Sequence, residues 1–271
     1  MAKIERFNLA EISINRILSA IKMRLEDIPH SVAWNLDTYS HRNREMIQSF
    51  HGIHKGKRCF IVANGPSLKK TNLELLNNEI TFGLNRIYLS FISSSFRPTY
   101  YLAVNELILE QFSHEISNLA MPKFLNWNRR FHFNPDINSI FFLKPKFVVN
   151  DFFQQDLTHP MVFGATVTFA AIQLAYYMGF EKVILVGMDH NYVEKGVPNS
   201  IEYRKDEQDE SHFDSQYFPK GIKWQLPDLK RSDLDYRIAR SVFEIHDREI
   251  VDATIDGNCS VFSKVDYLSL F

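Results

Sequence analysis

Cysteine is scarce in this chain, because Cys59 and Cys259 are the only two among 271 residues and they lie far apart. Two such residues form neither a disulfide framework nor the spacing of a zinc site, so we expect a reducing compartment, the cytoplasm. Long apolar runs are also absent. No run reaches the 18 residues or so that a membrane-spanning helix requires, and we recognise no secretory signal pattern.

An excess of charge of one sign is missing as well, since the net charge is -1 at pH 7. No global basic field therefore points to nucleic acid as a partner. The sequence contains no Gly-x-x-x-x-Gly-Lys-Ser/Thr, Gly-x-Gly-x-x-Gly, His-Glu-x-x-His or Gly-x-Ser-x-Gly motif. The missing phosphate loop argues against a standard NTPase.

Residues 1–50 form a predicted helical appendage. Aliphatic residues recur there at helical spacing, at Ile14, Ile17, Leu18, Ile21, Leu25 and Ile28. We expect Pro29 to end this helix. Basic residues on its other faces leave three roles open: packing on the main domain, assembly of a homo-oligomer, or peripheral contact with the inner face of the cell membrane.

From residue 58 onward, short apolar runs alternate with helical stretches. The predicted strands are 58–63, 80–84, 100–104, 123–125, 140–143, 146–149, 183–187 and 249–251. The predicted helices are 166–178 and about 233–246. This alternation is typical of an α/β fold, a Rossmann-like open parallel sheet with helices on both faces. We expect residues 51–271 to form that domain, with ligands at the carboxyl ends of its strands.

The first predicted strand stops abruptly at Asn64-Gly65-Pro66-Ser67. Gly65 permits backbone conformations closed to other residues, and Pro66 sets φ for a turn. Such a turn directs backbone N–H groups, an amide and a hydroxyl outward from the strand end, where nucleotides and phosphates bind in parallel sheets. An ordinary strand-to-loop turn is the alternative.

Asparagine also follows the next two predicted strands, in Asn85-Arg86 and Asn105-Glu106. Its neutral amide both donates and accepts, which suits a base edge or a ribose hydroxyl, although asparagine also favours turns. We expect Asn85 and Arg86 to contact a nucleotide and Asn105 and Glu106 to contact the substrate.

Two further stretches belong to the predicted site. Thr166 and Thr168 open the helix 166–178, whose N-terminus could receive a phosphate or simply be capped. Asp189 and Tyr192 come just after the strand 183–187, where substrate-contacting residues of this fold class lie. Asp233-Leu-Asp235 is formally an Asp-x-Asp metal signature, but it opens a predicted helix, where acidic residues favour the dipole. We therefore expect no metal site there.

Residues 193–232 are polar, charged and poor in aliphatic side chains. A stretch of this length without periodicity is typical of a functional lid or a disordered segment. Within it, His212 lies between Asp209 and Asp214, which could orient its ring for acid–base chemistry. A solvated, inert histidine is the plain alternative.

Three segments resemble a bacterial and archaeal family named after its archaeal 6-hydroxymethylpterin diphosphokinase. They are FIVANGPSLK at 60–69, ITFGLNRIY at 80–88 and VTFAAIQLAYYMGFEKVILVGMD at 167–189. The resemblance covers about residues 50–271. It implies a nucleotide-binding α/β fold without implying one reaction.

The same layout is similar to the Campylobacter-type sialyltransferases, which use a CMP-activated nonulosonic acid. That likeness implies that the turn 64–67 and Asn85 contact the nucleotide, and that Thr166 and Thr168 lie where phosphate and ribose are held. It also places Ser211-His212-Phe213 at the position of a catalytic Ser-His-Tyr in a mobile lid.

Two tyrosines steady the leaving phosphate in those sialyltransferases. Tyr192 and Tyr203 are the nearest matches here, although their spacing differs.

Three functions remain open on this basis. The first is an inverting glycosyltransferase for surface glycans, with a nucleotide-linked sugar as donor, a glycan as acceptor, His212 as general base and no cofactor. The second is Mg²⁺-dependent pyrophosphoryl transfer from ATP to a hydroxymethylpterin, for which Asp189, Asp206, Asp209 and Glu210 would supply carboxylates. The third is a non-catalytic nucleotide- or glycan-binding protein.

Overall fold

The computed structural model describes residues 14–134, 138–147, 152–191, 196–206 and 208–271. By its internal contacts the chain divides into two compact units, residues 1–42 and 43–271. The smaller unit is helical in its described part, and the larger unit holds the sheet. Within the described ranges, no helix combines the length and the apolar character that spanning a membrane requires.

The N-terminal helix α1 (Ile14–Leu36) runs through Pro29. The prediction that this proline ends the helix is therefore wrong. Proline lacks a backbone N–H, so the carbonyl of Leu25 loses its helical partner. Both residues are exposed, so water can supply the missing hydrogen bond and the helix continues. A second helix, α2 (Thr38–Gln48), follows directly.

The larger unit is built on one sheet in which every neighbouring pair of strands is parallel. Its strands are β1 (Arg58–Val62), β2 (Thr81–Leu84), β3 (Tyr100–Ala103), β4 (Lys123–Asn126), β5 (Ile140–Leu143), β6 (Lys182–Val186), β9 (Glu249–Asp252) and β10 (Ser263–Lys264). Their order is β10-β9-β6-β1-β2-β3-β4-β5. The chain extends the sheet from β1 to β5 and then places β6 on the other side of β1. The predicted Rossmann-like open parallel sheet is confirmed, with a topological switch point between β1 and β6.

The predicted strands coincide with β1 to β6 and β9 within one residue at each end. The strand predicted at 146–149 is different. Lys146 and Phe147 lie outside any strand, and residues 148 and 149 lie outside the described residues. Pro145 forms an isolated parallel bridge to Met161, and a proline cannot donate to a ladder of hydrogen bonds.

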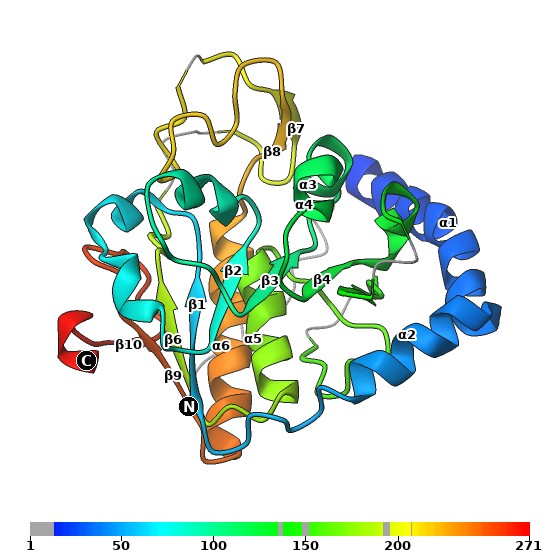
Figure 1. Cartoon of the computed structure of the whole chain (residues 1–271). Coiled ribbons are helices and arrows are strands. Elements are labelled where there is room, and N and C mark those ends of the chain that lie inside the picture. Colours follow the sequence, from blue (N-terminus) through cyan, green and yellow to red (C-terminus); the bar gives the residue numbers. More distant parts are fainter. Residues whose placement is uncertain (1–13, 135–137, 148–151, 192–195, 207) are drawn as a thin grey trace, which may run out of the picture. The chain divides into compact units, whose positions relative to one another are not determined.

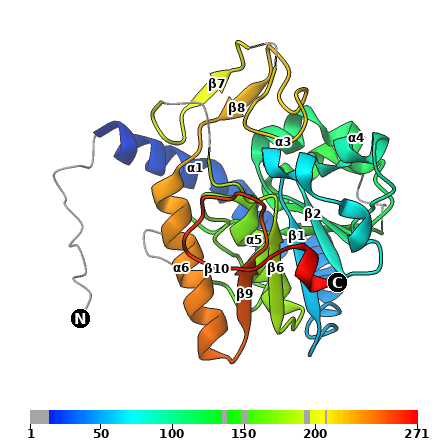
Figure 2. The same ribbon diagram turned by 90° about the vertical axis from the view of Figure 1, so that its left-hand side faces the viewer.

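Two long helices, α5 (Val167–Tyr177) and α6 (Leu229–Ile245), pack side by side along the sheet (Figures 1 and 2). Helix α5 matches the predicted helix. Helix α6 begins four residues before the predicted start at Asp233, because the side chain of Asp228 caps it and accepts from the N–H of Arg231 at 3.0 Å. Its polar first turn gave no hydrophobic signal.

The other face of the sheet is covered near β1 by the end of the chain. Phe60 stacks on Phe271 there, with ring centroids 5.8 Å apart, next to η6 (Leu268–Leu270). Shorter helices join the strands: η2 (Pro66–Lys70), η3 (Leu73–Leu76), η4 (Ile87–Ile92), α3 (Glu106–Gln111), α4 (Ser113–Ser117) and η5 (Trp127–His132). Helices therefore lie on both faces, as the sequence predicts, and β1 is buried between them.

The polar stretch before α6 rises above the carboxyl ends of the strands (Figures 1 and 2). We call its described residues, 196–206 and 208–228, the lid segment. It contains an antiparallel pair of strands, β7 (Ile201–Tyr203) and β8 (Lys223–Gln225). These strands have three residues each, too few for their alternation to be recognised in the sequence.

Candidate functional site

A cavity of about 170 Å³ lies at the carboxyl ends of the strands, beneath the lid segment. Its floor comes from the residues after β1, β2, β3 and β6, its wall from the first turns of α5 and α6, and its roof from the lid segment. The predicted site residues that line it are Asn64, Gly65, Asn85, Asn105, Thr166, Thr168, Asp189 and His212.

Other predicted site residues do not line this cavity, namely Pro66, Ser67, Arg86, Glu106 and Tyr203. Tyr203 lies on β7 with 60% of its surface exposed. Tyr192, the second predicted partner of a leaving phosphate, lies outside the described residues.

The turn after β1 closes on an aspartate that follows β6. The N–H and the hydroxyl of Ser67 donate to Oδ1 and Oδ2 of Asp189 at 3.0 and 2.6 Å. The N–H of Gly65 donates to the carbonyl of Gly187 at 2.8 Å. The donors that the sequence assigns to a ligand are thus used to hold Asp189 at the switch point.

Gly65 is needed in this turn for space, which differs from the predicted reason. Its φ of -69° is open to any residue. A Cβ at this position would lie 1.8 Å from Oδ2 of Asp189. Glycine therefore permits the close approach of β1 and β6, and a larger residue would displace the carboxylate.

Burial raises the pKa of the Asp189 carboxyl, and the nearby charge of Asp252 adds to this effect. The two hydrogen bonds from Ser67 oppose the rise, because they stabilise the ionised form. Asp189 is therefore a positioned acceptor at the edge of the cavity.

The asparagines after β1 and β2 line the cavity, and each has a buried side-chain oxygen. Asn64 donates from Nδ2 to the carbonyl of Leu84 at 3.0 Å, which ties β1 to β2. Its Oδ1 and the Oδ1 of Asn85 have no hydrogen-bond partner in the described part of the chain. Buried acceptors without a donor are costly. Two such atoms from neighbouring strands, both on cavity-lining residues, suit a ligand that donates hydrogen bonds.

Asn85 adopts an uncommon backbone conformation, with φ at 45°. Asparagine tolerates this left-handed region better than most residues. The sharp turn sends the chain away from the end of β2 while the Asn85 side chain stays among the cavity-lining residues.

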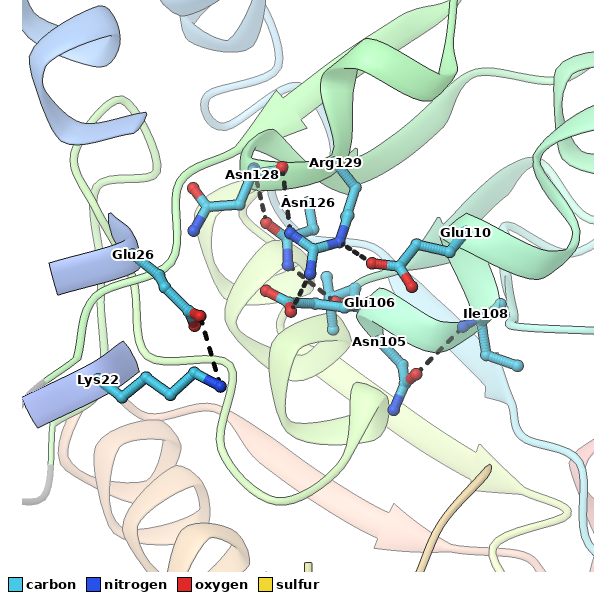
Figure 3. Close-up of polar contacts among 10 residues, drawn as sticks. Lys22, Glu26, Asn105, Glu106, Ile108, Glu110, Asn126, Asn128 and Arg129 are labelled. Atoms are coloured by element: carbon cyan, nitrogen blue, oxygen red, sulfur yellow. Dashed lines mark hydrogen bonds and ion pairs between the residues drawn. The ribbon is translucent and has the colours of Figure 1, made fainter. Parts of the chain in front are cut away.

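Asn105, directly after β3 and Val104, and Asn126, the last residue of β4, act mainly as helix caps (Figure 3). Oδ1 of Asn105 accepts from the N–H of Ile108 at 3.2 Å, and Oδ1 of Asn126 accepts from the N–H of Asn128 at 2.9 Å. Asn126 also donates to the carbonyl of Val104 at 3.1 Å, just as Asn64 does between β1 and β2. The sequence reasoning missed Asn126, although it continues the same strand-end pattern.

Glu106 takes part in a charged cluster beside the cavity. Arg129 lies between Glu106 and Glu110 and bonds to them at 2.5 and 2.6 Å (Figure 3). The cluster ties α3 to η5, so Glu106 has a structural partner.

Arg86 fastens the lid segment from below. Its guanidinium donates to the carbonyls of Gln216, at 2.9 Å, and Tyr217. It also lies 3.9 Å from the ring centroid of Phe112, a favourable cation–π contact. These contacts of Arg86 therefore hold the lid segment over the strand ends.

Two further contacts join the lid segment to the sheet side of the cavity. The N–H of Phe213 donates to the carbonyl of Asn64 at 2.9 Å. The amide of Gln111 in α3 exchanges two hydrogen bonds with the backbone of Lys223 in β8, at 2.8 and 2.9 Å. The lid segment is thus fixed at several points to the strand ends and to α3.

His212 forms a pair with a buried aspartate. Its Nδ1 lies 3.0 and 2.9 Å from the two carboxylate oxygens of Asp209, whose side chain is 0% exposed. Its ring stacks on Tyr217 with centroids 3.9 Å apart and an interplanar angle of 4°. With Nδ1–H donated to Asp209, Nε2 is the basic nitrogen of the neutral ring. Of the two flanking carboxylates, Asp209 orients the ring, while Asp214 accepts from the N–H of Gln216 at 2.7 Å.

Asp209 remains a carboxylate despite its burial. Burial alone raises its pKa, but the hydrogen bond and the charge of His212, the charge of Arg204 and the N–H of Ser211 outweigh this and lower the pKa. An ionised Asp209 fixes the tautomer of His212 and stabilises the ring when it gains a proton.

The start of α5 is held by α6. Thr166 caps α5 by accepting from the N–H of Phe169 at 3.3 Å, and its hydroxyl lies 3.0 Å from that of Tyr236. Oδ2 of Asp235 accepts from the N–H of Ala165 at 2.8 Å. These contacts present the N-terminal turn of α5 to the cavity.

Because α6 begins at Leu229, the Asp233-Leu-Asp235 motif lies inside this helix rather than at its start. Asp233 bonds to Nε2 of His190 at 2.9 Å, and Asp235 bonds to Arg231 at 2.7 Å. Among the residues that the structure describes, no three His, Cys, Asp or Glu side chains gather into a metal-binding group. Each carboxylate of this motif has a protein partner.

The cavity residues that the sequence reasoning missed include His190, Tyr217 and Tyr236. His190 directly follows Asp189, so its place after β6 was a usable signal. Tyr217 and Tyr236 gave none, because their positions depend on how the lid segment and α6 pack.

A similar fold occurs in the MAf glycosyltransferase from Magnetospirillum magneticum AMB-1, with a TM-score of 0.51 and 13% sequence identity. The match covers 85% of this chain and 39% of that chain, so it spans well under half of the glycosyltransferase. At this identity the likeness concerns the fold.

No curated protein matches the chain significantly. The profile of the family described as 6-hydroxymethylpterin diphosphokinase MptE-like matches residues 33–195, more than half of the chain. The match includes β1 to β6, α5 and most of the cavity floor. The chain therefore belongs to the 6-hydroxymethylpterin diphosphokinase MptE-like family.

Proposed function

We propose that this protein is a glycosyltransferase that moves a sugar from a nucleotide-linked donor, with CMP as the carrier, to a glycan acceptor of the cell surface. The His212–Asp209 pair above the strand ends carries the proposal. An oriented histidine that lines a cavity is suited to remove a proton from an acceptor hydroxyl. The fold shared with a glycosyltransferase is consistent with it.

In the proposed reaction, the acceptor oxygen attacks the anomeric carbon as its proton passes to Nε2 of His212. The bond between the anomeric carbon and the phosphate oxygen breaks, and the electron pair stays on the phosphate. Direct displacement inverts the anomeric centre. Asp209 stabilises the protonated ring, and the stacked Tyr217 keeps its plane fixed.

Recognition of the donor rests on the floor of the cavity. The buried Oδ1 atoms of Asn64 and Asn85 accept hydrogen bonds. An exocyclic amino group such as that of cytosine, or a ribose hydroxyl, supplies the donors they lack. Neither asparagine adds charge, so recognition does not add to the negative charge near the phosphate.

The family description favours a second candidate, pyrophosphoryl transfer from ATP to a hydroxymethylpterin. That chemistry gathers charge around Mg²⁺ and calls for clustered carboxylates. Asp189 is bonded to Ser67 and Asp209 to His212, while Asp206 and Glu210 are exposed and do not line the cavity. This arrangement suits the first candidate better.

Binding and turnover measurements separate these functions. Thermal shifts would be recorded with CMP, CDP, UMP, GMP, AMP and ATP, each with and without Mg²⁺, because a ligand of the folded state stabilises it. We expect stabilisation by CMP without Mg²⁺ and release of CMP from a CMP-sugar when a glycan acceptor is added. Strict Mg²⁺ dependence with AMP release would support the diphosphokinase. CMP binding without turnover of any donor would support a binding protein.

A further inference from the structure

A second histidine–aspartate pair joins a cavity-lining residue, His190, to Asp233, which lies outside the cavity lining, and the proposed proton transfer to His212 does not use it. His190 follows β6, and its Nε2 lies 2.9 Å from Oδ1 of Asp233 in α6. The His190 side chain is 10% exposed and lines the cavity, while that of Asp233 is 42% exposed. His190 is therefore the more buried partner of the pair and the one that lines the cavity.

Hydroxyl groups and a helix start accompany His190. Its ring centroid lies 5.9 Å from that of Tyr236, whose hydroxyl is 3.0 Å from Oγ1 of Thr166. Thr166 caps the 11-residue helix α5, and Thr166, Val167 and Thr168 line the same cavity. An imidazole, hydroxyls and the N–H groups of a helix start are the donors that bind phosphate in proteins.

A separate feature favours a ligand in this cavity. Asn64 is 7% exposed, and its Oδ1 has no partner in the described part of the chain. An acceptor of this kind is stabilised by a ligand that donates hydrogen bonds. The cavity thus combines hydrogen-bond acceptors after β1 and β2 with hydrogen-bond donors around α5. This arrangement is complementary to a nucleoside monophosphate, whose base and ribose donate and whose phosphate accepts.

We infer that His190, Tyr236 and the first turn of α5 bind the phosphate that joins nucleoside and sugar, with Asp233 positioning His190. The inference rests on the proposed glycosyltransferase function and assigns its leaving-group subsite. As an imidazolium, His190 donates from Nε2 to Asp233 and from Nδ1 to a phosphate oxygen. When the bond to the anomeric carbon breaks, this oxygen keeps the electron pair and His190 keeps its proton, since the acceptor proton goes to His212.

The test compares ligands with and without the phosphate. Calorimetric titrations would use CMP, UMP, GMP and AMP and the four matching nucleosides. The nucleotide that binds the wild type most tightly is then measured on His190→Asn, Asp233→Asn and Tyr236→Phe. Asparagine suits position 190 because φ there is 55°. His159→Asn is the matched control, since His159 pairs with Asp156 at 3.1 Å and does not line the cavity.

We expect His190→Asn to weaken the nucleotide at least tenfold, in line with the loss of a charge-assisted hydrogen bond. Asp233→Asn should weaken it about threefold because it acts through His190. The matching nucleoside should bind all variants within twofold of the wild type, which also reports that they are folded. Tyr236→Phe keeps the test decisive if His190→Asn does not fold.

Two outcomes overturn the inference alone. One is a wild type that binds nucleotide and nucleoside equally well, and the other is a set of variants that lose both ligands equally or neither. If the wild type binds none of the four nucleotides, the proposed function fails together with the subsite.

Discussion

The turn after β1 and the lid segment differ in what their polar groups do. In the turn, the hydroxyl and N–H of Ser67 both hold Asp189, and Gly65 makes room for that carboxylate. In the lid segment, Asp209 holds His212 with its ring among the cavity residues. The more distinctive sequence motif therefore serves the architecture, while the plainer polar stretch contributes a paired histidine to the cavity.

The difference follows from what lies next to each segment. The turn is at the switch point, where β6 brings Asp189 within hydrogen-bond distance. The lid segment faces the strand ends across the cavity and is fixed there by Arg86 and by the carbonyl of Asn64. Rigid anchoring lets a loop position a catalytic side chain.

We expect the largest effect from a substitution of His212 in the lid segment. We expect His212→Gln to lower kcat for sugar transfer by about 10²- to 10⁴-fold, the usual contribution of a general base. Initial rates of CMP release measure this effect. CMP affinity should change less than threefold, and His159→Gln serves as a control outside the cavity. Unchanged turnover in His212→Gln would contradict the assignment.

In the turn after β1, we expect a substitution of Gly65 to lower stability. Gly65→Ala places a Cβ against the Asp189 carboxylate, and we expect the free energy of unfolding to fall by about 2–3 kcal/mol because the site is overpacked. Urea unfolding measures this loss. Gly52→Ala is the control: a Cβ there meets nothing within 4 Å but requires φ of +68°, which costs about 1 kcal/mol. Equal losses would show that space at Gly65 is unimportant.

The pH dependence of stability tests the contribution of Asp209 in the lid segment. We expect Asp209→Asn to lower the free energy of unfolding at pH 7 by about 2 kcal/mol, because a charge-assisted hydrogen bond is lost. Burial raises the pKa of Asp209, but His212, Arg204 and Ser211 lower it overall. The contribution is then complete above the unfolded pKa of about 3.9 and disappears as the pH falls through the lower folded value. Urea unfolding of both proteins between pH 7 and pH 3 tests this, and a difference that grows toward acid would refute it.

We expect the smallest effect from a substitution of Ser67 in the turn after β1. Ser67→Ala removes one hydrogen bond to Asp189, so we expect about 1 kcal/mol less stability and a CMP affinity within twofold of the wild type. The exposed Ser49 donates to the carbonyl of Met46, so Ser49→Ala is a matched control with a smaller effect. A clear loss of CMP affinity in Ser67→Ala would instead assign the turn to the ligand.

Much of the scaffold could be predicted from local patterns. Buried strands such as β1 and β6 are continuous apolar runs, and α5 combines a threonine cap with Gly179 just past its end. The predictions failed where solvent or a cap outweighed the pattern, as at Pro29 and at the start of α6. Of the site, the strand-end asparagines and His212 were identified from sequence, because chain position alone brings them to one edge of the sheet.

The sequence by itself determined the parallel α/β scaffold, the strand ends as the place of the cavity, and His212 as a residue of the polar stretch that lines it. Those features depend on periodicity and on residues adjacent in the chain. Only the tertiary structure decided that Ser67 serves Asp189, that Arg86 holds the lid segment, and that His190 meets Asp233 beside Tyr236. Each of these contacts joins residues more than 40 positions apart, and packing of the sheet, α6 and the lid segment brings them within hydrogen-bond distance.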